Sequence, residues 1–144
     1  MSIGVRPEER HRMIAEAAYF LAQERGFHGG DPVSDWIEAE RRVDRQLLAL
    51  AASRLVERLE SGIATATKNL TALKRRVSTL AAGARTEFSA DVAKLDALKV
   101  SLRSTLAGLK DRSDDVSQKA LRQAEGLWNE LNETLQSVTA RTHH

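Results

Sequence analysis

The chain has no cysteine, two prolines and few aromatic residues: two Trp, one Tyr and three Phe among 144 positions. Without cysteine it forms no disulfide and offers no thiolate for catalysis or metal binding. Pro7 and Pro32 both lie near the start, so no proline interrupts a helix in the remaining 112 residues. No uncharged run approaches the length of a bilayer-spanning helix, and the first residues lack the apolar run of a secretory signal. We therefore expect a cytoplasmic protein.

Charge is distributed unevenly along the chain. Residues 1–46 carry nine acidic residues against seven Arg and no Lys, whereas residues 47–110 carry eleven Lys and Arg against five acidic residues. A basic middle segment can be neutralised by acidic neighbours within a helical bundle, or it can face a polyanion. Neutralisation within a bundle is the more economical interpretation.

The N-terminal third predicts a helical hairpin. Residues 13–22 are apolar at every position but Glu16, which is typical of a helix that is covered on several sides. Gly26 directly after Arg25 can end this helix in a left-handed conformation. Asp31 and Pro32 then provide an N-cap and a first helical residue for a second helix. We expect the first helix over about residues 8–25 and the second from Pro32.

Four of the six aromatic residues fall in this hairpin, and we expect them to form a small aromatic core. The second helix carries a helical stripe that begins at Trp36. An ion-pair network drawn from Glu24, Arg25, Asp35, Glu40 and Arg41 would tie the two helices together. The aromatic residues are Tyr19, Phe20, Phe27 and Trp36, and the stripe continues through Ala39, Val43 and Leu47.

Several residues of this segment stand at fixed spacings: Ile14-Ala15, Ala18-Tyr19, Ala22, Arg25-Gly26-Phe27, Gly30, Asp35-Trp36 and Ala39-Glu40. In these positions the first third of the chain resembles the bacterial domain-of-unknown-function (DUF) family twenty-nine thirty-four. The resemblance implies a compact helical module. It brings no activity, cofactor or catalytic residue, because none is attached to that family.

The rest of the chain predicts long amphipathic helices. Apolar residues recur at steps of three and four from Ile63 to Ala84 and continue to Leu109, and another stripe follows Ser113, a candidate N-cap. A turn is expected near residues 110–114. Gly62 and Gly83 are each compatible with a turn or with a helix interior, because one glycine costs only about 1 kcal/mol within a helix. The last stripe comprises Val116, Ala120, Ala124, Leu127, Leu131, Leu135 and Val138.

The sequence therefore predicts an all-α protein with an N-terminal helical hairpin in residues 1–46. Long amphipathic helices follow in residues 47–144 and form an antiparallel bundle or a coiled coil. An uninterrupted helix over residues 63–109 would be about 70 Å long, and a final helix of half that length leaves part of it uncovered. The second helix or a second chain must cover the remainder. We favour three or four antiparallel helices that also form a homo-oligomer.

No residue pattern indicates a reaction, a metal or a cofactor. His28 has only Asp31 and Asp35 nearby, and aspartates before a helix usually act as caps. Gly29-Gly30 precedes a helix as a phosphate cradle would, but the same two acids would repel an anion. We therefore expect no catalysis and no cofactor.

The expected function is non-catalytic protein–protein interaction, as a scaffold, adaptor or accessory subunit. The hairpin would act as the recognition head and the long helices would serve oligomerisation or docking. Two alternatives remain: nucleic-acid binding by the basic middle helix, and a phasin-like coat on a granule or surface. The candidate residues for a protein partner are Tyr19, Arg25, Phe27, His28, Asp35, Trp36, Glu40 and Trp128, and those for a polyanion are Lys74, Arg75, Arg76 and Arg85.

Overall fold

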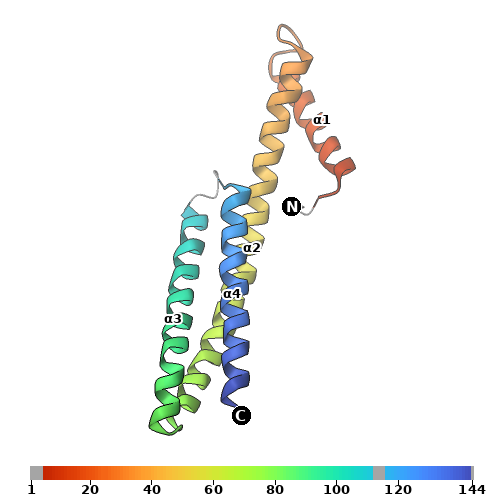
Figure 1. The fold of residues 1–144 in the computed structure, drawn as a ribbon. Helices are drawn as coiled ribbons and strands as arrows, with labels where there is room; N and C mark the ends of the chain where they lie inside the picture. Colours follow the sequence, from red (N-terminus) through yellow and green to blue (C-terminus); the bar gives the residue numbers. More distant parts are fainter. Residues whose placement is uncertain (1–4, 112–115, 144) are drawn as a thin grey trace.

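The computed structural model describes residues 5–111 and 116–143 (Figure 1). These residues form four helices and no strand, which confirms the predicted all-α class. Among them, no helix combines the length and the apolar character that crossing a bilayer requires. The helices are α1 (Pro7–Glu24), α2 (Pro32–Ser78), α3 (Ala82–Asp111) and α4 (Gln118–Thr142).

The ends of α1 follow the predicted signals. Pro7 is the first helical residue, and the first turn is acidic, which suits the positive end of the helix dipole. At the other end, the N–H of Gly26 donates to the carbonyl of Gln23 and that of Phe27 to the carbonyl of Ala22, both at 2.9 Å. This pair of bonds is a Schellman motif, which satisfies carbonyls that the helix end leaves free.

The second helix begins where the sequence predicts and then runs for 47 residues, or about 70 Å. Its N-cap Asp31 accepts a hydrogen bond from the N–H of Val33 at 3.1 Å. Gly62 lies inside the helix. The chain reverses at residues 79–81, and Gly83 falls in the first turn of α3. Of the two glycines, only Gly83 therefore stands beside a turn.

The predicted stripe from Ile63 to Leu109 is divided between two antiparallel helices, α2 and α3. Its apolar rhythm continues across the reversal because both helices face the same core with the same spacing. The hydroxyl of Thr86 donates to the carbonyl of Ala82 at 3.0 Å inside α3.

The connection from α3 to α4 falls near the predicted turn at residues 110–114, of which residues 112–114 lie outside the described residues. The expected cap Ser113 is among them. The N-cap of α4 is Ser117, whose hydroxyl oxygen accepts from the N–H of Ala120 at 3.1 Å.

Two separate hydrophobic clusters lie along α2, on different sides of the helix. The hairpin cluster involves Leu47 and the bundle cluster begins at Ala52. Five residues correspond to a rotation of about 140° around a helix. The helix α1 and the α3–α4 pair therefore lie on opposite sides of α2, as Figure 1 shows. Whether residues 1–46 and 47–144 fold independently stays a prediction.

The bundle consists of the C-terminal part of α2 with α3 and α4, and its core is mainly leucine. Trp128 of α4 packs against this core, and its ring covers Gly62 so closely that an added Cβ would lie 2.6 Å from the ring. The lack of a side chain at Gly62 thus leaves the space that the ring of Trp128 occupies. The buried leucines are Leu55, Leu59, Leu70, Leu73, Leu95, Leu102, Leu106, Leu109, Leu121, Leu131 and Leu135.

The hairpin core is aliphatic, which corrects the expected aromatic core. Its buried residues are Ile14, Ala39, Val43 and Leu47, and Trp36 only packs against their edge. The remaining hairpin aromatics are exposed because α1 is covered by α2 on one side alone. The expectation that residues 13–22 are covered on several sides is therefore not met within one chain.

Candidate protein-interaction site

The loop that joins α1 to α2 has an unusual backbone. Four of its residues adopt positive φ angles: Gly26 (65°), Phe27 (60°), Gly29 (66°) and Gly30 (74°). Glycine adopts such angles without strain, whereas a residue with a side chain pays roughly 1–2 kcal/mol. Phe27 is the single non-glycine residue with a positive φ in the described part of the chain.

Phe27 forms an exposed aromatic cluster with two residues of α1. The ring centroid of Tyr19 lies 5.6 Å from that of Phe27 and 5.9 Å from that of Phe20. Each of the three side chains is more than half exposed: Tyr19 56%, Phe20 51% and Phe27 58%. Edge and tilted contacts of this kind hold the rings in place while their faces stay in water.

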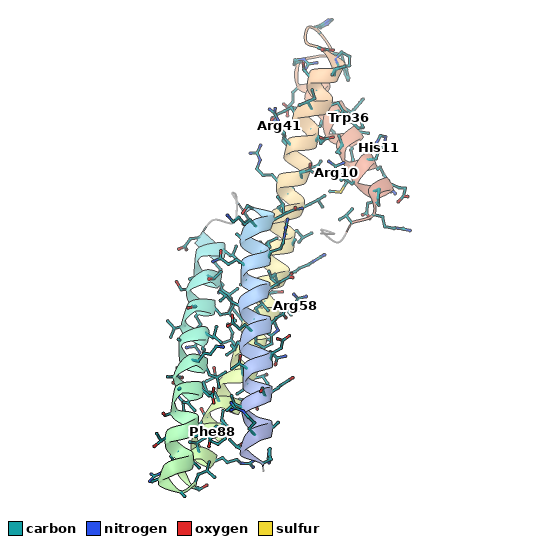
Figure 2. All side chains as sticks on the ribbon, viewed as in Figure 1. Arg10, His11, Trp36, Arg41, Arg58 and Phe88 are labelled. Carbon is teal, nitrogen blue, oxygen red and sulfur yellow. The ribbon has the colours of Figure 1, made fainter. Side chains whose placement is uncertain are left out.

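A groove next to this cluster separates the tips of the two helices. Three alanines of α1 and Pro32 give it a shallow apolar surface, and Tyr19, Phe27 and Trp36 stand around it. The ring of Trp36 also contacts His11, with 5.0 Å between centroids (Figure 2). The alanines are Ala15, Ala18 and Ala22.

An ion pair closes one end of the groove. The guanidinium of Arg25 donates two hydrogen bonds to the Asp35 carboxylate, one of them at 2.7 Å from Nη2 to Oδ2. Asp35 is only 9% exposed, and the bonds from Arg25 hold the pKa of its carboxyl below the usual value. Glycine suits position 30 because its φ of 74° is strained for a residue with a side chain, and an added Cβ would also lie 2.7 Å from the Arg25 Cζ and displace the guanidinium.

A second ion pair ties the other end of α1 to α2. Arg10 donates to Asp44 from Nε at 2.8 Å and from Nη2 at 2.9 Å, and its Nη2 lies 3.8 Å from a Glu40 oxygen. The ion pairs predicted from the sequence across the hairpin include neither Arg10 nor Asp44. Arg10 and Asp44 are 34 residues apart, so no local sequence pattern indicates that they pair. Predicting the pair requires knowing how the two antiparallel helices are aligned.

The structure brings five of the eight predicted partner-binding residues to one place. Tyr19, Arg25, Phe27, Asp35 and Trp36 all line the groove. The other three lie elsewhere: the side chain of His28 is exposed in the loop, Glu40 is near Arg10, and Trp128 is in the bundle. Phe20 and His11, which were not selected, border the same region.

The four residues considered for polyanion binding lie around the α2–α3 reversal. Lys74 forms an ion pair with Asp96 at 3.0 Å, and the Arg76 guanidinium contacts the His143 ring. Arg75 and Arg85 are exposed. Half of the group is thus engaged within the chain.

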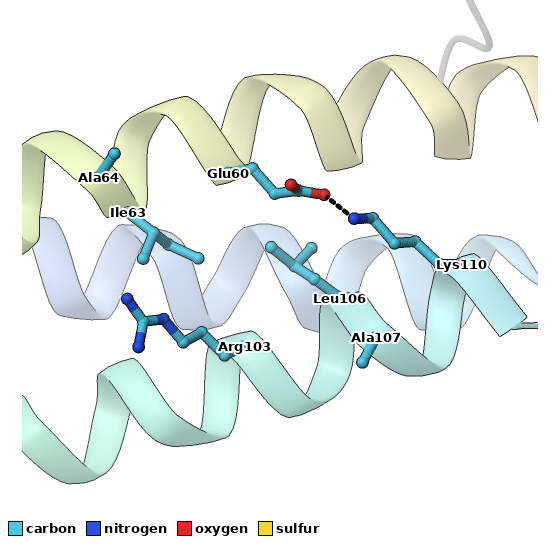
Figure 3. Close-up of a pocket in the computed structure, with 7 residues that line it drawn as sticks. All are labelled: Glu60, Ile63, Ala64, Arg103, Leu106, Ala107 and Lys110. Atoms are coloured by element: carbon cyan, nitrogen blue, oxygen red, sulfur yellow. Dashed lines mark ion pairs between the residues drawn. The ribbon is translucent and has the colours of Figure 1, made fainter.

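Another hollow lies in the bundle between α2 and α3 (Figure 3). Ile63, Leu106 and two alanines line it together with Arg103, and an ion pair from Lys110 to Glu60 at 2.6 Å spans its edge. Across residues 5–111 and 116–143, no three His, Asp or Glu side chains gather as metal ligands would. The hairpin groove, with its exposed rings, remains the best-defined candidate site.

Comparison with known proteins adds one finding. Residues 9–45 match the model of the family described as "Protein of unknown function (DUF2934)", which confirms the resemblance of the N-terminal part. The match spans most of α1, the loop and the first part of α2, and it includes every residue that lines the groove. No curated protein and no solved structure matches the chain.

Proposed function

We propose that the protein acts by binding another protein through the hairpin groove, as a non-catalytic scaffold, adaptor or accessory subunit. The observation that carries the proposal is the backbone of Phe27. A bulky side chain is held at φ +60°, at a cost in stability, yet 58% of it stays exposed and contributes little to the core. Backbone strain of this kind clusters at functional sites, so a strained residue whose side chain adds little to the core favours a role in binding.

The surroundings of Phe27 suit protein recognition. Aromatic side chains offer a large contact area and lose little conformational entropy on binding, so they dominate the energetics of many interfaces. The Arg25–Asp35 pair and the α1–α2 core fix the positions of Tyr19 and Trp36 before binding. The long helices would then serve oligomerisation or docking.

The substitution Phe27→Gly tests the proposal because it separates stability from binding. Glycine relieves the positive φ, so we expect the variant to be as stable as the natural protein or more so. A protein captured at stoichiometric amounts from a lysate of the source organism should nevertheless be lost. Val100→Ala, which alters an exposed apolar residue of α3, serves as the matched control and should retain the captured protein.

Nuclease treatment of the same lysate tests the nucleic-acid alternative. Captured material that disappears with nuclease, survives Phe27→Gly and is lost in Arg75→Glu would assign the function to the basic end of the bundle instead. Capture that is unchanged by both Phe27→Gly and Tyr19→Ala would overturn the proposal for the hairpin.

A further inference from the structure

The helix α1 has a second exposed face, distinct from the groove. Five residues at steps of three and four form a stripe on its outer side, away from α2, and all are exposed. They share no residue with the groove. The stripe comprises Glu9, Arg12, Glu16, Phe20 and Gln23.

A matching stripe runs along α2 beyond the end of α1. The residues of α2 that face α1 include Ala39, Val43 and Leu47, and the same side of the helix continues as exposed residues. The α3–α4 pair lies on the opposite side and leaves this side uncovered. The stripe on α2 begins with Leu50, which is 45% exposed, and continues through Arg54, Glu57, Ser61, Thr65 and Lys68.

The charged residues of both stripes have no ion-pair partner within the described residues, although nine ion pairs form elsewhere in this part of the chain. On α1 they are Glu9, Arg12 and Glu16, and on α2 they are Arg54, Glu57 and Lys68. Both stripes thus combine an uncovered apolar residue, Phe20 or Leu50, with charges that are free to pair.

The two stripes are complementary in a single register. If the outer face of α1 lies parallel to α2 of another molecule, a shift of 45 residues places Glu9 opposite Arg54 and Arg12 opposite Glu57. The same shift places Phe20 opposite Thr65 and Gln23 opposite Lys68. Opposite charges therefore meet at two positions, and the Phe20 ring meets the methyl group of a threonine.

Two-fold symmetry allows this contact to form twice. Within one chain α1 runs antiparallel to α2, and the Arg10–Asp44 pair sets Glu9 at about the level of residue 45. If Glu9 lies opposite Arg54 of an antiparallel second copy, residue 45 of one α2 is level with residue 54 of the other. The two-fold axis then passes midway between these positions, near residue 50. Both α1 helices then lie between the two α2 helices. Each α1 is on its own side of the two-fold axis, so the two do not overlap.

We propose that the protein forms an antiparallel homodimer in which the outer face of α1 docks on residues 50–68 of α2 of a second copy. The dimer covers α1 on a second side and there buries Phe20, which is 51% exposed in the single chain. The proposal specifies the oligomerisation part of the proposed function and rests on it. Phe20 contacts Tyr19 at the edge of the groove, whereas Glu9 and Arg54 do not line it, so changes at these two charges test the dimer separately from target binding.

Charge reversal in the full-length chain tests the register. Glu9→Arg and Arg54→Glu should each weaken dimerisation about tenfold or more in sedimentation experiments, because each change acts twice per dimer. The double variant Glu9→Arg/Arg54→Glu should return to within about threefold of the natural protein. Glu8→Arg, in the same helical turn but outside the stripe, and Arg122→Glu on α4 are the matched controls and should have little effect.

The absence of cysteine makes disulfide trapping a second test. Phe20→Cys combined with Thr65→Cys should give a disulfide-linked dimer under mild oxidation. Within one chain the two positions are about 45 Å apart along α2, so only an intermolecular bond can form. Phe20→Cys with Ala72→Cys, two turns further along the same stripe, should link far less.

Three results would overturn the proposal. They are a protein that stays monomeric at every concentration measured, a double charge variant no better than the single ones, and equal linking of the two cysteine pairs. None of these results bears on the capture experiment with Phe27→Gly, so failure of the dimer and failure of target binding are distinguishable.

Discussion

The bundle and the hairpin share one long helix but differ in what holds them together. In the described residues the bundle cluster contains 20 buried apolar side chains, whereas the hairpin cluster contains four, two of them small. The hairpin adds two bidentate arginine–carboxylate pairs, Arg10 with Asp44 and Arg25 with Asp35. Because partly exposed ion pairs contribute little, we expect the hairpin to open at a lower free energy than the bundle.

The two regions also differ in how they use aromatic residues. In the bundle, Phe88 is buried and Trp128 packs on the core, so both contribute to stability. In the hairpin, Tyr19, Phe20 and Phe27 are more than half exposed. The region with the smaller core thus exposes most of the aromatic surface, and this is the surface that the proposed partner would cover.

Truncation of a bundle leucine should have the largest effect on stability. Leu95 is fully buried, and Leu95→Ala should reduce the free energy of unfolding by about 3 kcal/mol, since it removes apolar contacts and leaves a cavity. Chemical denaturation followed by circular dichroism measures the change. Val100→Ala on the exposed side of the same helix is the control. A similar loss in both variants would contradict the assignment of Leu95 to the core.

Truncation of a side chain in the hairpin core should destabilise the hairpin without destabilising the bundle. Ile14 is 1% exposed, and Ile14→Ala should destabilise the hairpin by about 2 kcal/mol. Hydrogen exchange of α1 amides should become roughly thirtyfold faster, while amides in α3 and α4 keep their rates. If the bundle amides accelerated equally, hairpin and bundle would be one cooperative unit and the comparison would fail.

The contact between Gly62 and Trp128 predicts that enlarging residue 62 lowers stability moderately. The cause is overpacking, whereas truncation of a core residue acts by leaving a cavity. Gly62→Ala should cost about 1–3 kcal/mol, because the added methyl group displaces the ring of Trp128. Gly126→Ala, at a helical position with open space around the added atom, should instead raise stability by about 0.5–1 kcal/mol. Thermal or chemical unfolding distinguishes the two signs. A stabilising Gly62→Ala would contradict the packing described here.

Much of the fold was predictable because its signals are local. Asp31-Pro32 marks the start of α2 and Gly26 the end of α1, and each acts through hydrogen bonds within a few residues. The apolar stripes predicted the faces of the helices. They left open where the stripe from Ile63 to Leu109 reverses, because a turn of three residues barely disturbs a heptad pattern.

The sequence predicted several residues of the candidate site, but it did not predict that their side chains are exposed around a groove. Tyr19, Phe27 and Trp36 were selected as partner-binding residues, yet they were also expected to fill a core. Their exposure depends on how α2 passes α1, and hydrophobicity alone does not determine that. Aliphatic residues of α2 fill the contact instead, namely Ala39, Val43 and Leu47.

The smallest expected effect concerns the pH dependence of the hairpin. Arg25 lowers the pKa of Asp35 in the folded state, so ionised Asp35 contributes stability at pH values above its unfolded pKa of about 3.8. That contribution is lost as the pH falls through the lower, folded value. The protection of the loop and α1 amides against hydrogen exchange, corrected for the pH dependence of chemical exchange, should therefore fall below about pH 3.8 in the natural protein.

The variant Asp35→Asn isolates this contribution from those of the other carboxyl groups. Its loop should exchange faster than that of the natural protein at neutral pH, and the difference should shrink as the pH falls below 3.8. Glu133→Gln, an exposed change on α4, should leave both curves unchanged. A constant difference between the natural protein and Asp35→Asn at all pH values would mean that Asp35 acts by shape and hydrogen bonding alone, and that its charge contributes nothing to the hairpin.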